Sequence, residues 1–560
     1  MVRQCKFRPH FKVVAALVAA LVTALPPALA AGTEGGPDNH AKIIPLGDPL
    51  YRSIDLLYNE AGLAPPSGSR PWSIDEWNRV LSRLEAHQGA VSAPLSLAGR
   101  TTLERIRQRL EDERNYRTVR GETYQADISL AVALEAYGHA NKDDFPDERD
   151  WVYGYTERAA AAALALEMEL HTWLYLYTDV EYRKNRYAYE KKTDSATSEP
   201  LYNKHLTTNL HLLDHVAFET PYRAFASAGG DRWNLTFGRD SVRWGHGRSG
   251  NFVLNDHLDY HDLLRFVSYH ERLKVEATYL FLHHSDFTTD SEEPPPGMRM
   301  FLGHRVEFRP IPRLSFAITE NVMYQNNVVE PGVLNPLYIF HNLNNRSMFN
   351  AIASAEVEAA VLPGLTLLYQ FSLYQAQAPL EGGSQPDAMA HLGGYRVVYP
   401  YGRGYLYHEL EGVYSDTYMY QRDIVDMKVL RREFVHGYGF ATHREFLGYP
   451  YGGDVVVLST AFGYHRPEAF DVRLDIEHLR QGEIGIDTDI ESTGDFDLGR
   501  RAPSGTVEER LRTGVEASWN PWRTLQVFGR LDLVHVWNKG NESRSLVWDF
   551  QYALGTSYRF

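Results

Sequence analysis

The residues best suited to binding chemistry lie in a glycine-rich stretch between 238 and 256. Four glycines fall within thirteen residues around Trp244, so the backbone can turn tightly and leave amides and an aromatic face accessible. Arg239, Arg243, Trp244 and Asn255 could bind a sugar, because an aromatic ring stacks on a sugar face and polar side chains bond to hydroxyls. The same glycines could instead only let a strand bend or pack against an inward loop, and we favour that structural interpretation.

A second polar group follows at 334–345, where Asn335, His341 and Asn342 stand close together. These side chains could bind a ligand, or their polar groups could only satisfy the backbone of a loop. The spacing leaves both interpretations open.

The histidines do not form a metal-binding pattern. Two groups stand close together: His205, His211 and His215, and the adjacent His283 and His284. Neighbouring residues on a strand face opposite sides, so an adjacent pair cannot hold one ion without a bend. The single cysteine is Cys5, and the H-E-x-x-H spacing does not occur. We therefore expect no metal and no cofactor.

Hydrolytic chemistry has weak support in the sequence. Ser249 stands among glycines, but the G-x-S-x-G elbow of serine hydrolases is absent. The carboxylate pairs Glu167/Glu169 and Asp471/Asp475 each fall on one strand face, where they could be glycosidase acids or solvated lumen charges. We prefer lumen charges and expect no catalytic residue, although a dyad built across strands would leave no spacing signal.

The elements that carry these residues are predicted to be strands. From about Gln125, apolar residues alternate with smaller or polar ones, which is the period of a strand with two different faces. Residues 158–170 have high helix propensity, but the alternation continues from Leu164 to Tyr177, so we predict strands there as well.

The connections fall into two classes. Very short turns are predicted at Pro310–Pro312, Pro363-Gly364 and Asn520-Pro521. Long polar connections are predicted at about 184–200, 283–300, 376–392 and 479–508. Short turns alternating with long loops are typical of an up-and-down outer-membrane barrel, with the turns in the periplasm and the loops outside the cell.

The C-terminal strand gives the sharpest single signal. One face carries mainly aromatic and apolar residues: Phe550, Tyr552, Leu554, Thr556, Tyr558 and Phe560. The other face is polar or small, as expected for a closing strand with lipid outside and a polar lumen inside. The sequence thus predicts a mainly β chain, with a transmembrane antiparallel outer-membrane β-barrel of about 16–18 strands over residues 121–560.

The N-terminal residues predict export. Residues 1–30 contain a basic segment, an apolar core and an Ala28-Leu29-Ala30 cleavage site, so we expect a signal peptide. Removing these residues, which hold four Lys/Arg and no Asp/Glu, would lower the formal net charge from −15 to −19. A chain this acidic is a poor candidate for binding nucleic acid.

Residues 31–120 are expected to form a short helical region in the periplasm. Asp48 can cap a first helix, and Ser73 with Glu76 forms a capping box at the start of a second. Trp72 and Trp77 flank that box at the positions of a hydrophobic staple. Short amphipathic helices of this kind need a partner surface, which either the other helices or the end of the barrel can supply.

The glycine-rich stretch at residues 238–255 resembles a motif of the Wzi family of capsule-assembly outer-membrane proteins, G-(K/R)-x-x-x-x-W-G-x-G-x-x-G-(N/S)-L-x-L-(S/N). The stretches 334–345 and 446–454 resemble that family's N-P-L…H-N…N-N and L-G-x-P-x-G motifs, and the helical region also matches. The resemblance implies a barrel of about 18 strands with a periplasmic helical bundle that attaches or organises surface polysaccharide. Two departures are Phe252, where leucine is usual, and acidic loops, which would repel an acidic capsule unless cations bridge them.

The expected protein is therefore a non-enzymatic barrel of the outer membrane, surrounded by outer-membrane lipid, with surface polysaccharide (capsule or exopolysaccharide) as its partner. Its expected role is the assembly or attachment of that polysaccharide. A diffusion porin is the first alternative, which an open, water-wide lumen would favour. A barrel-embedded hydrolase is the second, which a Ser or a carboxylate pair within hydrogen-bond reach of a His would favour. The glycan, the oligomeric state and the openness of the lumen stay open.

Overall fold

The protein is described from a computed structural model. The described residues are 39–90, 94–114, 119–146, 150–188, 201–202, 207–210, 216–217, 220–283, 297–326, 331–335, 338–340, 348–375, 387–421, 425–435, 439–488, 501–544 and 546–560. The expected signal peptide, residues 1–30, and the histidines His205, His211, His215 and His284 lie outside them.

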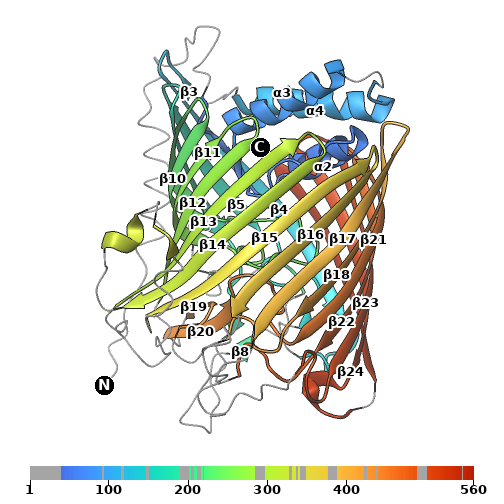
Figure 1. Ribbon diagram of the computed structural model, residues 1–560. Coiled ribbons are helices and arrows are strands. Elements are labelled where there is room, and N and C mark those ends of the chain that lie inside the picture. Colours follow the sequence, from blue (N-terminus) through green and yellow to red (C-terminus); the bar gives the residue numbers. More distant parts are fainter. Residues whose placement is uncertain are drawn as a thin grey trace, which may run out of the picture.

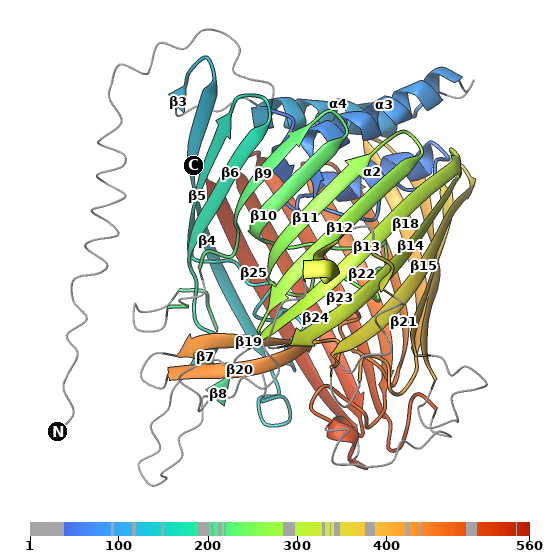
Figure 2. The same ribbon diagram turned by 60° about the vertical axis from the view of Figure 1, so that its left-hand side comes forward.

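Eighteen antiparallel strands of the described chain close into one barrel (Figures 1 and 2). In order they are β4 (Tyr124–His139), β5 (Ala162–Leu170), β6 (Leu174–Tyr182), β9 (Ala224–Gly230), β10 (Trp233–Asp240), β11 (His261–Tyr269), β12 (Leu273–Leu282), β13 (Met298–Ile311), β14 (Leu314–Asn326), β15 (Phe349–Leu362), β16 (Leu365–Gln375), β17 (Ala388–Tyr401), β18 (Gly404–Ser415), β21 (Val455–Arg466), β22 (Phe470–Gln481), β23 (Glu508–Trp522), β24 (Leu525–Trp537) and β25 (Val547–Arg559). The predicted fold class is confirmed, and β5 is a strand despite its helix propensity.

Four further pairings are short or lie outside the barrel wall. They are β3 (Val119–Arg120) on the edge of β4, β1 (Ile43–Ile44) with β2 (Trp72–Ser73), β7 (Tyr187–Ala188) with β8 (Leu201–Tyr202), and β19 (Lys428–Val435) with β20 (Gly439–Phe446). Two short 3-10 helices are also present: η4 (Pro331–Leu334) and η6 (Lys539–Asn541).

The last strand closes the barrel in the predicted orientation. β25 pairs with β4, and the Phe560 N–H donates to the Leu130 carbonyl at 2.8 Å. Phe550, Tyr552 and Leu554 are 40%, 40% and 53% exposed on its outer face, whereas the residues between them are buried. Lipid-facing apolar side chains and a polar inner face are the pattern of a transmembrane barrel.

The inner face of the barrel wall carries paired charges. Arg265 of β11 donates to Glu276 of β12 at 2.8 Å, and Arg305 of β13 contacts Glu356 of β15 at 2.6 Å. All four side chains are buried. Paired, hydrogen-bonded charges are tolerated inside a protein, so this face does not need bulk water to be stable.

The two ends of the barrel differ as predicted. The short turns at Pro310–Pro312, Pro363-Gly364 and Asn520-Pro521 join β13 to β14, β15 to β16 and β23 to β24, and we call this the short-turn end. The opposite end is the loop end. The long connections expected at 283–300 and 376–392 are shorter than predicted, because the strands that follow them begin earlier. β13 already pairs with a neighbouring strand at Met298, and β17 does so at Ala388.

Three helices lie across the short-turn end (Figure 1): α2 (Leu50–Glu60), α3 (Ile74–Ala90) and α4 (Leu97–Arg114). The helical segment is bonded to the turns, since the Ala64 N–H donates to the Pro312 carbonyl at 3.0 Å and the Gly364 N–H donates to the Asn59 carbonyl at 2.8 Å. Among the described residues, no helix combines the length and apolarity needed to cross a bilayer.

Half of the predicted capping box forms at the start of α3. The Glu76 N–H donates to Ser73 Oγ at 3.3 Å, but the Glu76 carboxylate accepts from Lys274 Nζ at 2.6 Å instead of returning to Ser73. The reciprocal half of the prediction is wrong, because a charge-assisted bond to an ammonium is stronger than one to a backbone amide. Trp72 and Trp77 do pack together, with ring centroids 4.8 Å apart.

Candidate functional site

The glycine-rich stretch folds into the barrel. Residues 241–260 connect β10 to β11 from the loop end, and we call them the inward loop. Trp244 on this loop is 1% exposed, and its indole N–H donates to Glu276 on the inner wall at 2.8 Å. Its ring packs on Phe301 with centroids 6.5 Å apart. The loop is therefore anchored to the wall by a buried tryptophan.

The inward loop meets the N-terminal segment inside the barrel. The Arg70 N–H donates to the Arg243 carbonyl at 2.9 Å, and the Arg243 N–H donates back to the Arg70 carbonyl at 3.0 Å. Further along, the Arg248 N–H donates to Glu411 of β18 at 2.6 Å. Segments from the two ends of the barrel thus join within it, and the loop crosses to a distant part of the wall.

Two glycines permit this path. Gly245 and Gly250 have φ of +109° and +145°, which side-chain-bearing residues rarely adopt. A Cβ on Gly245 would overlap Asn251 and Gln370, and a Cβ on Gly250 would overlap Pro450. The glycines are explained by close packing of the loop, which agrees with the structural interpretation that we favoured.

Three of the four residues proposed from this stretch, Arg243, Trp244 and Asn255, lie in the inward loop and have partners within the protein. Trp244 and Asn255 are buried, and Asn255 bonds to His257 at 2.9 Å. Arg243 donates to Asp256 at 3.1 Å and to loop carbonyls. These contacts account for the three residues without a ligand, and their ligand role stays a prediction.

The other predicted site residues are less informative. Arg239 donates to Asp262 at 2.8 Å, and its guanidinium lies 4.0 Å from the ring centroid of Tyr260. Asn335 is exposed at the end of η4, where its N–H donates to the Gly332 carbonyl at 3.2 Å. His341 and Asn342 lie outside the described residues. Of the second predicted cluster, the structure thus places Asn335 alone, and the ligand role of these residues stays a prediction.

A second segment covers the inward loop. Residues 416–454, which include β19 and β20, connect β18 to β21 at the loop end, and we call them the hairpin segment. Figure 2 shows β19 and β20 at the end of the barrel opposite to the helices. Tyr449 and Tyr420 of this segment pack with Phe252 of the inward loop in one apolar core, together with inward-facing residues of the wall. This core fills part of the barrel interior.

A charged chamber remains beside α2. It has a volume of about 560 Å³ and is bounded by α2, the inward loop and β17 to β24. Its lining holds eight arginines and eight carboxylates, so its charges balance. A chamber of this kind holds water and ions easily, and residues Arg243 and His246 to Ser249 of the inward loop line one side of it.

One group of residues meets the distance condition for a serine hydrolase. Ser53 Oγ of α2 lies 3.1 Å from His465 Nε2, and His465 Nδ1 lies 2.7 Å from Asp471 Oδ2. Ser53 is 2% exposed, and its hydroxyl also lies 3.2 Å from the Pro49 carbonyl within the same helix. We interpret the three side chains as a tether between α2 and the wall. Ser249, by contrast, contacts Glu411 and Tyr449.

An aromatic cavity opens among the connections of the loop end, and we call it the loop-end pocket. It has a volume of about 330 Å³. Its lining comes from the β4–β5 connection, Arg186, β20 and the β22–β23 connection: Trp151, Gly154, Tyr155, Thr156, Arg186, Thr442, His443, Arg444, Glu445, Ile486 and Asp487. Trp151 and Tyr155 are buried, at 9% and 6% exposed, whereas Arg444 is exposed.

Charged groups hold the pocket in shape. Arg186 donates to His443 Nε2 at 2.8 Å, and its guanidinium lies 4.7 Å from the ring centroid of Tyr155. Burial raises the pKa of Glu445, but the neighbouring His443 and Arg186 outweigh burial and hold that pKa well below its usual range. Glu445 is therefore ionised at neutral pH and can accept hydrogen bonds from a hydroxyl-rich ligand.

Sequence reasoning missed this pocket. The signal it could have used is the run Trp151-Val152-Tyr153-Gly154-Tyr155, which places three aromatic residues in five positions of the β4–β5 connection. Aromatic residues in a polar loop are unusual unless they pack or bind. Arg186 and Thr442 stand far away in the sequence, so spacing alone could not join them to this run.

No protein-family model matches this chain, and no curated protein matches it. Among solved structures, Wzi of Escherichia coli has 14% identity to it, covering 93% of this chain and 100% of that chain with a TM-score of 0.56. The fold is similar to that of Wzi. This confirms the resemblance predicted from the motifs at the level of the fold, which is that of an outer-membrane β-barrel.

Wzi is described as an outer-membrane protein involved in group 1 capsule assembly and as a carbohydrate-binding β-barrel. Two other similar structures come from Pseudomonas aeruginosa. OprD has 10% identity over 78% of this chain and 95% of that chain, with a TM-score of 0.37. OccK3 has 9% identity over 78% of this chain and 96% of that chain, with a TM-score of 0.40.

Proposed function

We propose that this chain is a non-enzymatic outer-membrane barrel that binds surface polysaccharide at its loop end. Its role would be the assembly or attachment of capsule or exopolysaccharide at the cell surface. The loop-end pocket is the single observation that carries this proposal, because it combines two aromatic rings with exposed polar groups at the end of a barrel similar in fold to a carbohydrate-binding one.

The orientation follows from the two ends of the barrel. In outer-membrane barrels the short turns face the periplasm and the long loops face outward. The helices of the expected region 31–120 are bonded to the short turns, so we place them in the periplasm. The loop-end pocket then faces the cell exterior, where surface polysaccharide lies.

The size and charge of the loop-end pocket suit a short stretch of sugar. A cavity of about 330 Å³ lies at the lower end of the range for small-ligand sites. Arg186 and Arg444 balance Glu445 and Asp487, so the lining selects for hydroxyl groups more than for net charge. Among the described residues, no carboxylate lies within ion-pair distance of Arg444, which leaves its guanidinium available to a ligand.

A porin is the alternative that the charged chamber favours, since it provides about 560 Å³ of polar space in the barrel. The inward loop opposes a porin, because it is bonded to the N-terminal segment inside the barrel and occupies part of the lumen together with the hairpin segment. Conductance in planar bilayers separates the two functions, since a porin would give single-channel steps in the wild type.

Polysaccharide binding by the purified full chain tests the proposal. We would titrate detergent-solubilised protein with polysaccharide from the producing strain and measure affinity by calorimetry. Arg444→Gln removes a charge-assisted hydrogen bond and should weaken binding about tenfold. Trp151→Ala should weaken it at least as much, because it removes an aromatic wall of the pocket.

The matched control is Arg403→Gln, which makes the same charge change at an exposed arginine in the β17–β18 turn, at the opposite end. Its affinity should equal that of the wild type. Equal binding by wild type, Arg444→Gln and Trp151→Ala would overturn the loop-end pocket as the binding site.

A further inference from the structure

A small cleft at the short-turn end concentrates positive charge in an acidic chain. It lies between α3 and the turns that join β11 to β12 and β13 to β14, and it measures about 30 Å³. Its lining holds five cationic side chains and two carboxylates, although the chain as a whole has a net charge of −15. The cations are Arg79, Arg83, Arg272, Lys274 and Arg309, and the carboxylates are Glu76 and Glu307.

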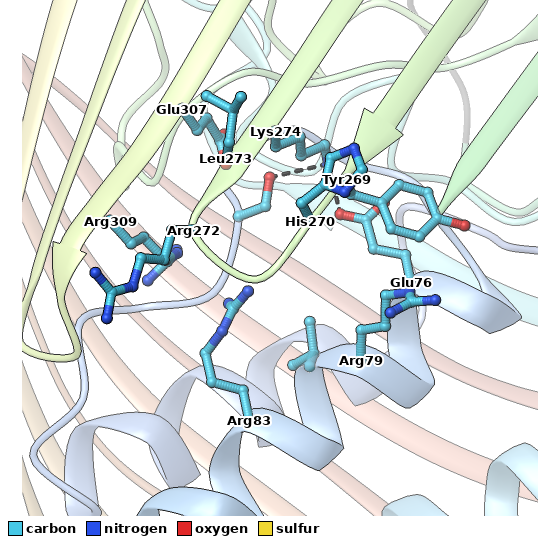
Figure 3. Close-up of a pocket in the computed structure, with 12 residues that line it drawn as sticks. Glu76, Arg79, Arg83, Tyr269, His270, Arg272, Leu273, Lys274, Glu307 and Arg309 are labelled. Carbon is cyan, nitrogen blue, oxygen red and sulfur yellow. Dashed lines mark hydrogen bonds and ion pairs between the residues drawn. The ribbon is translucent and has the colours of Figure 1, made fainter. Parts of the chain in front are cut away.

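Both carboxylates of this cleft are already engaged. Lys274 Nζ lies 2.6 Å from Glu76, and Arg305, which lies behind the cleft, donates to Glu307 at 2.9 Å. Figure 3 shows Lys274 and Glu76 in contact on one side of the cleft. Each carboxylate therefore has its ion pair with a cation other than Arg83, Arg272 or Arg309.

Three guanidiniums of this cleft form no direct ion pair within the described residues. Among the described residues, no carboxylate lies within ion-pair distance of Arg83, Arg272 or Arg309. Arg309 is 8% exposed, and within the described part of the chain it donates to the carbonyls of Ala64 and Pro65. Burying a cation beside other cations is costly unless an anion compensates it. Arg272 is exposed and Arg83 is half-buried, so an anion that enters from solvent can reach these two guanidiniums beside buried Arg309.

The geometry of the cleft selects the kind of anion. In Figure 3, Arg83 points from α3 toward the strands, and Arg272 and Arg309 lie on the strand side of the same cleft. A volume of 30 Å³ admits about two water-sized groups, so two oxygens of a phosphate fit and a sugar ring does not. Guanidinium groups present paired N–H donors that match phosphate oxygens.

The outer wall beside the cleft is apolar. Leu273, which also lines the cleft, is 41% exposed, and its partner Phe308 on β13 is 47% exposed. Ile311 at the end of β13 is 54% exposed. These side chains lie where the acyl chains of a lipid would run if its headgroup reached the cleft. A free inorganic anion has no apolar part that could cover these side chains.

We propose that this cleft binds a phosphate group and that a phospholipid of the leaflet at the short-turn end supplies it. Arg83, Arg272 and Arg309 would hold the phosphate, and the acyl chains would cover Leu273, Phe308 and Ile311. A bound lipid would then fasten α3 to the rim of the barrel. This proposal is independent of polysaccharide binding, which concerns the other end.

Native mass spectrometry of the full chain in detergent micelles tests the proposal with phosphatidylglycerol as the probe. The double variant Arg83→Gln/Arg272→Gln leaves buried Arg309 in place and should bind the lipid about tenfold more weakly than the wild type. Arg313→Gln is the matched control, since Arg313 is an exposed arginine of the β13–β14 turn that does not line the cleft. It should retain the lipid like the wild type.

Inorganic phosphate separates the two sources of the anion. If millimolar phosphate displaces the lipid from the wild type, and this effect of phosphate is absent in the double variant, the result would support the proposal in full. Phosphate binding without any retained lipid would keep the phosphate site and overturn the lipid as its source. Equal lipid retention by the double variant, the control and the wild type, with all three folded by circular dichroism, would overturn the site itself.

Discussion

Replacement of Trp244 by alanine should release the inward loop and open the barrel. Removal of a buried tryptophan costs about 3–5 kcal/mol in packing. The lost bond from the indole N–H to Glu276 adds about 1 kcal/mol, and no more, because Glu276 keeps its 2.8 Å contact with Arg265. The loss falls on the local equilibrium between the packed and released loop. The two losses together come to at least about 4 kcal/mol, and a loss of that size shifts the equilibrium roughly a thousandfold toward the released loop.

Planar-bilayer conductance reads out this change. The wild type should show no steps of porin size, and Trp244→Ala should show frequent openings. Trp244→Phe keeps most of the packing and should lie between the two. Trp173→Ala is the control, because Trp173 lies in the β5–β6 turn, is 49% exposed and does not contact the loop. Steady conductance in the wild type, or identical closed traces for Trp244→Ala and the control, would refute the reasoning.

The remaining predictions concern the helices. Burial raises the pKa of Glu113, but Lys42 at 2.7 Å and Arg109 outweigh burial and lower that pKa to about 2. Since the pKa of Glu113 in the folded state lies below the ordinary value of 4.5, ionised Glu113 stabilises the folded helices above pH 4.5. This contribution is about 3 kcal/mol, and it is lost as the pH falls from 4.5 toward 2. Helical circular dichroism during acid titration should therefore fall over this range in the wild type and less steeply in Glu113→Gln; equal slopes would count against the ion pair. For Ser53, a fluorophosphonate probe should not label the wild-type chain, because the hydroxyl is buried in a tether. Labelling that disappears in Ser53→Ala would instead establish a nucleophile.

Much of the fold could be predicted from local patterns. Alternation along β25 and the short turn at Pro363-Gly364 are properties of neighbouring residues, and each imposes a strand or a reversal directly. The same holds for β5, where continuing alternation outweighed helix propensity. Because a barrel is built from such hairpins, these signals were enough to give its class, and the length of the remaining chain gave a range of about 16–18 strands.

The interior could not be predicted in this way. The pairing of Arg70 with Arg243 joins segments that enter from opposite ends, and no periodicity marks either residue. Local patterns likewise could not predict the contact between Glu76 and Lys274, which are far apart in the sequence. This contact takes the place of the bond from Glu76 back to Ser73 in the predicted capping box. Trp244 was a reasonable candidate for sugar stacking until its contact with Glu276 placed it in the core. Glycine-rich sequence signals an unusual backbone, but it does not say which way the loop folds.

Retention of surface polysaccharide by cells tests the central claim most directly. A strain that lacks this chain would be complemented with the wild type, Trp151→Ala, Arg444→Gln or Arg403→Gln, at matched levels in the outer membrane, and cell-bound polysaccharide would be measured against the amount shed into the medium. We expect the wild type and Arg403→Gln to restore retention, and the two variants of the loop-end pocket to leave most of the polysaccharide in the medium. Equal retention with and without the chain would contradict a role in polysaccharide attachment.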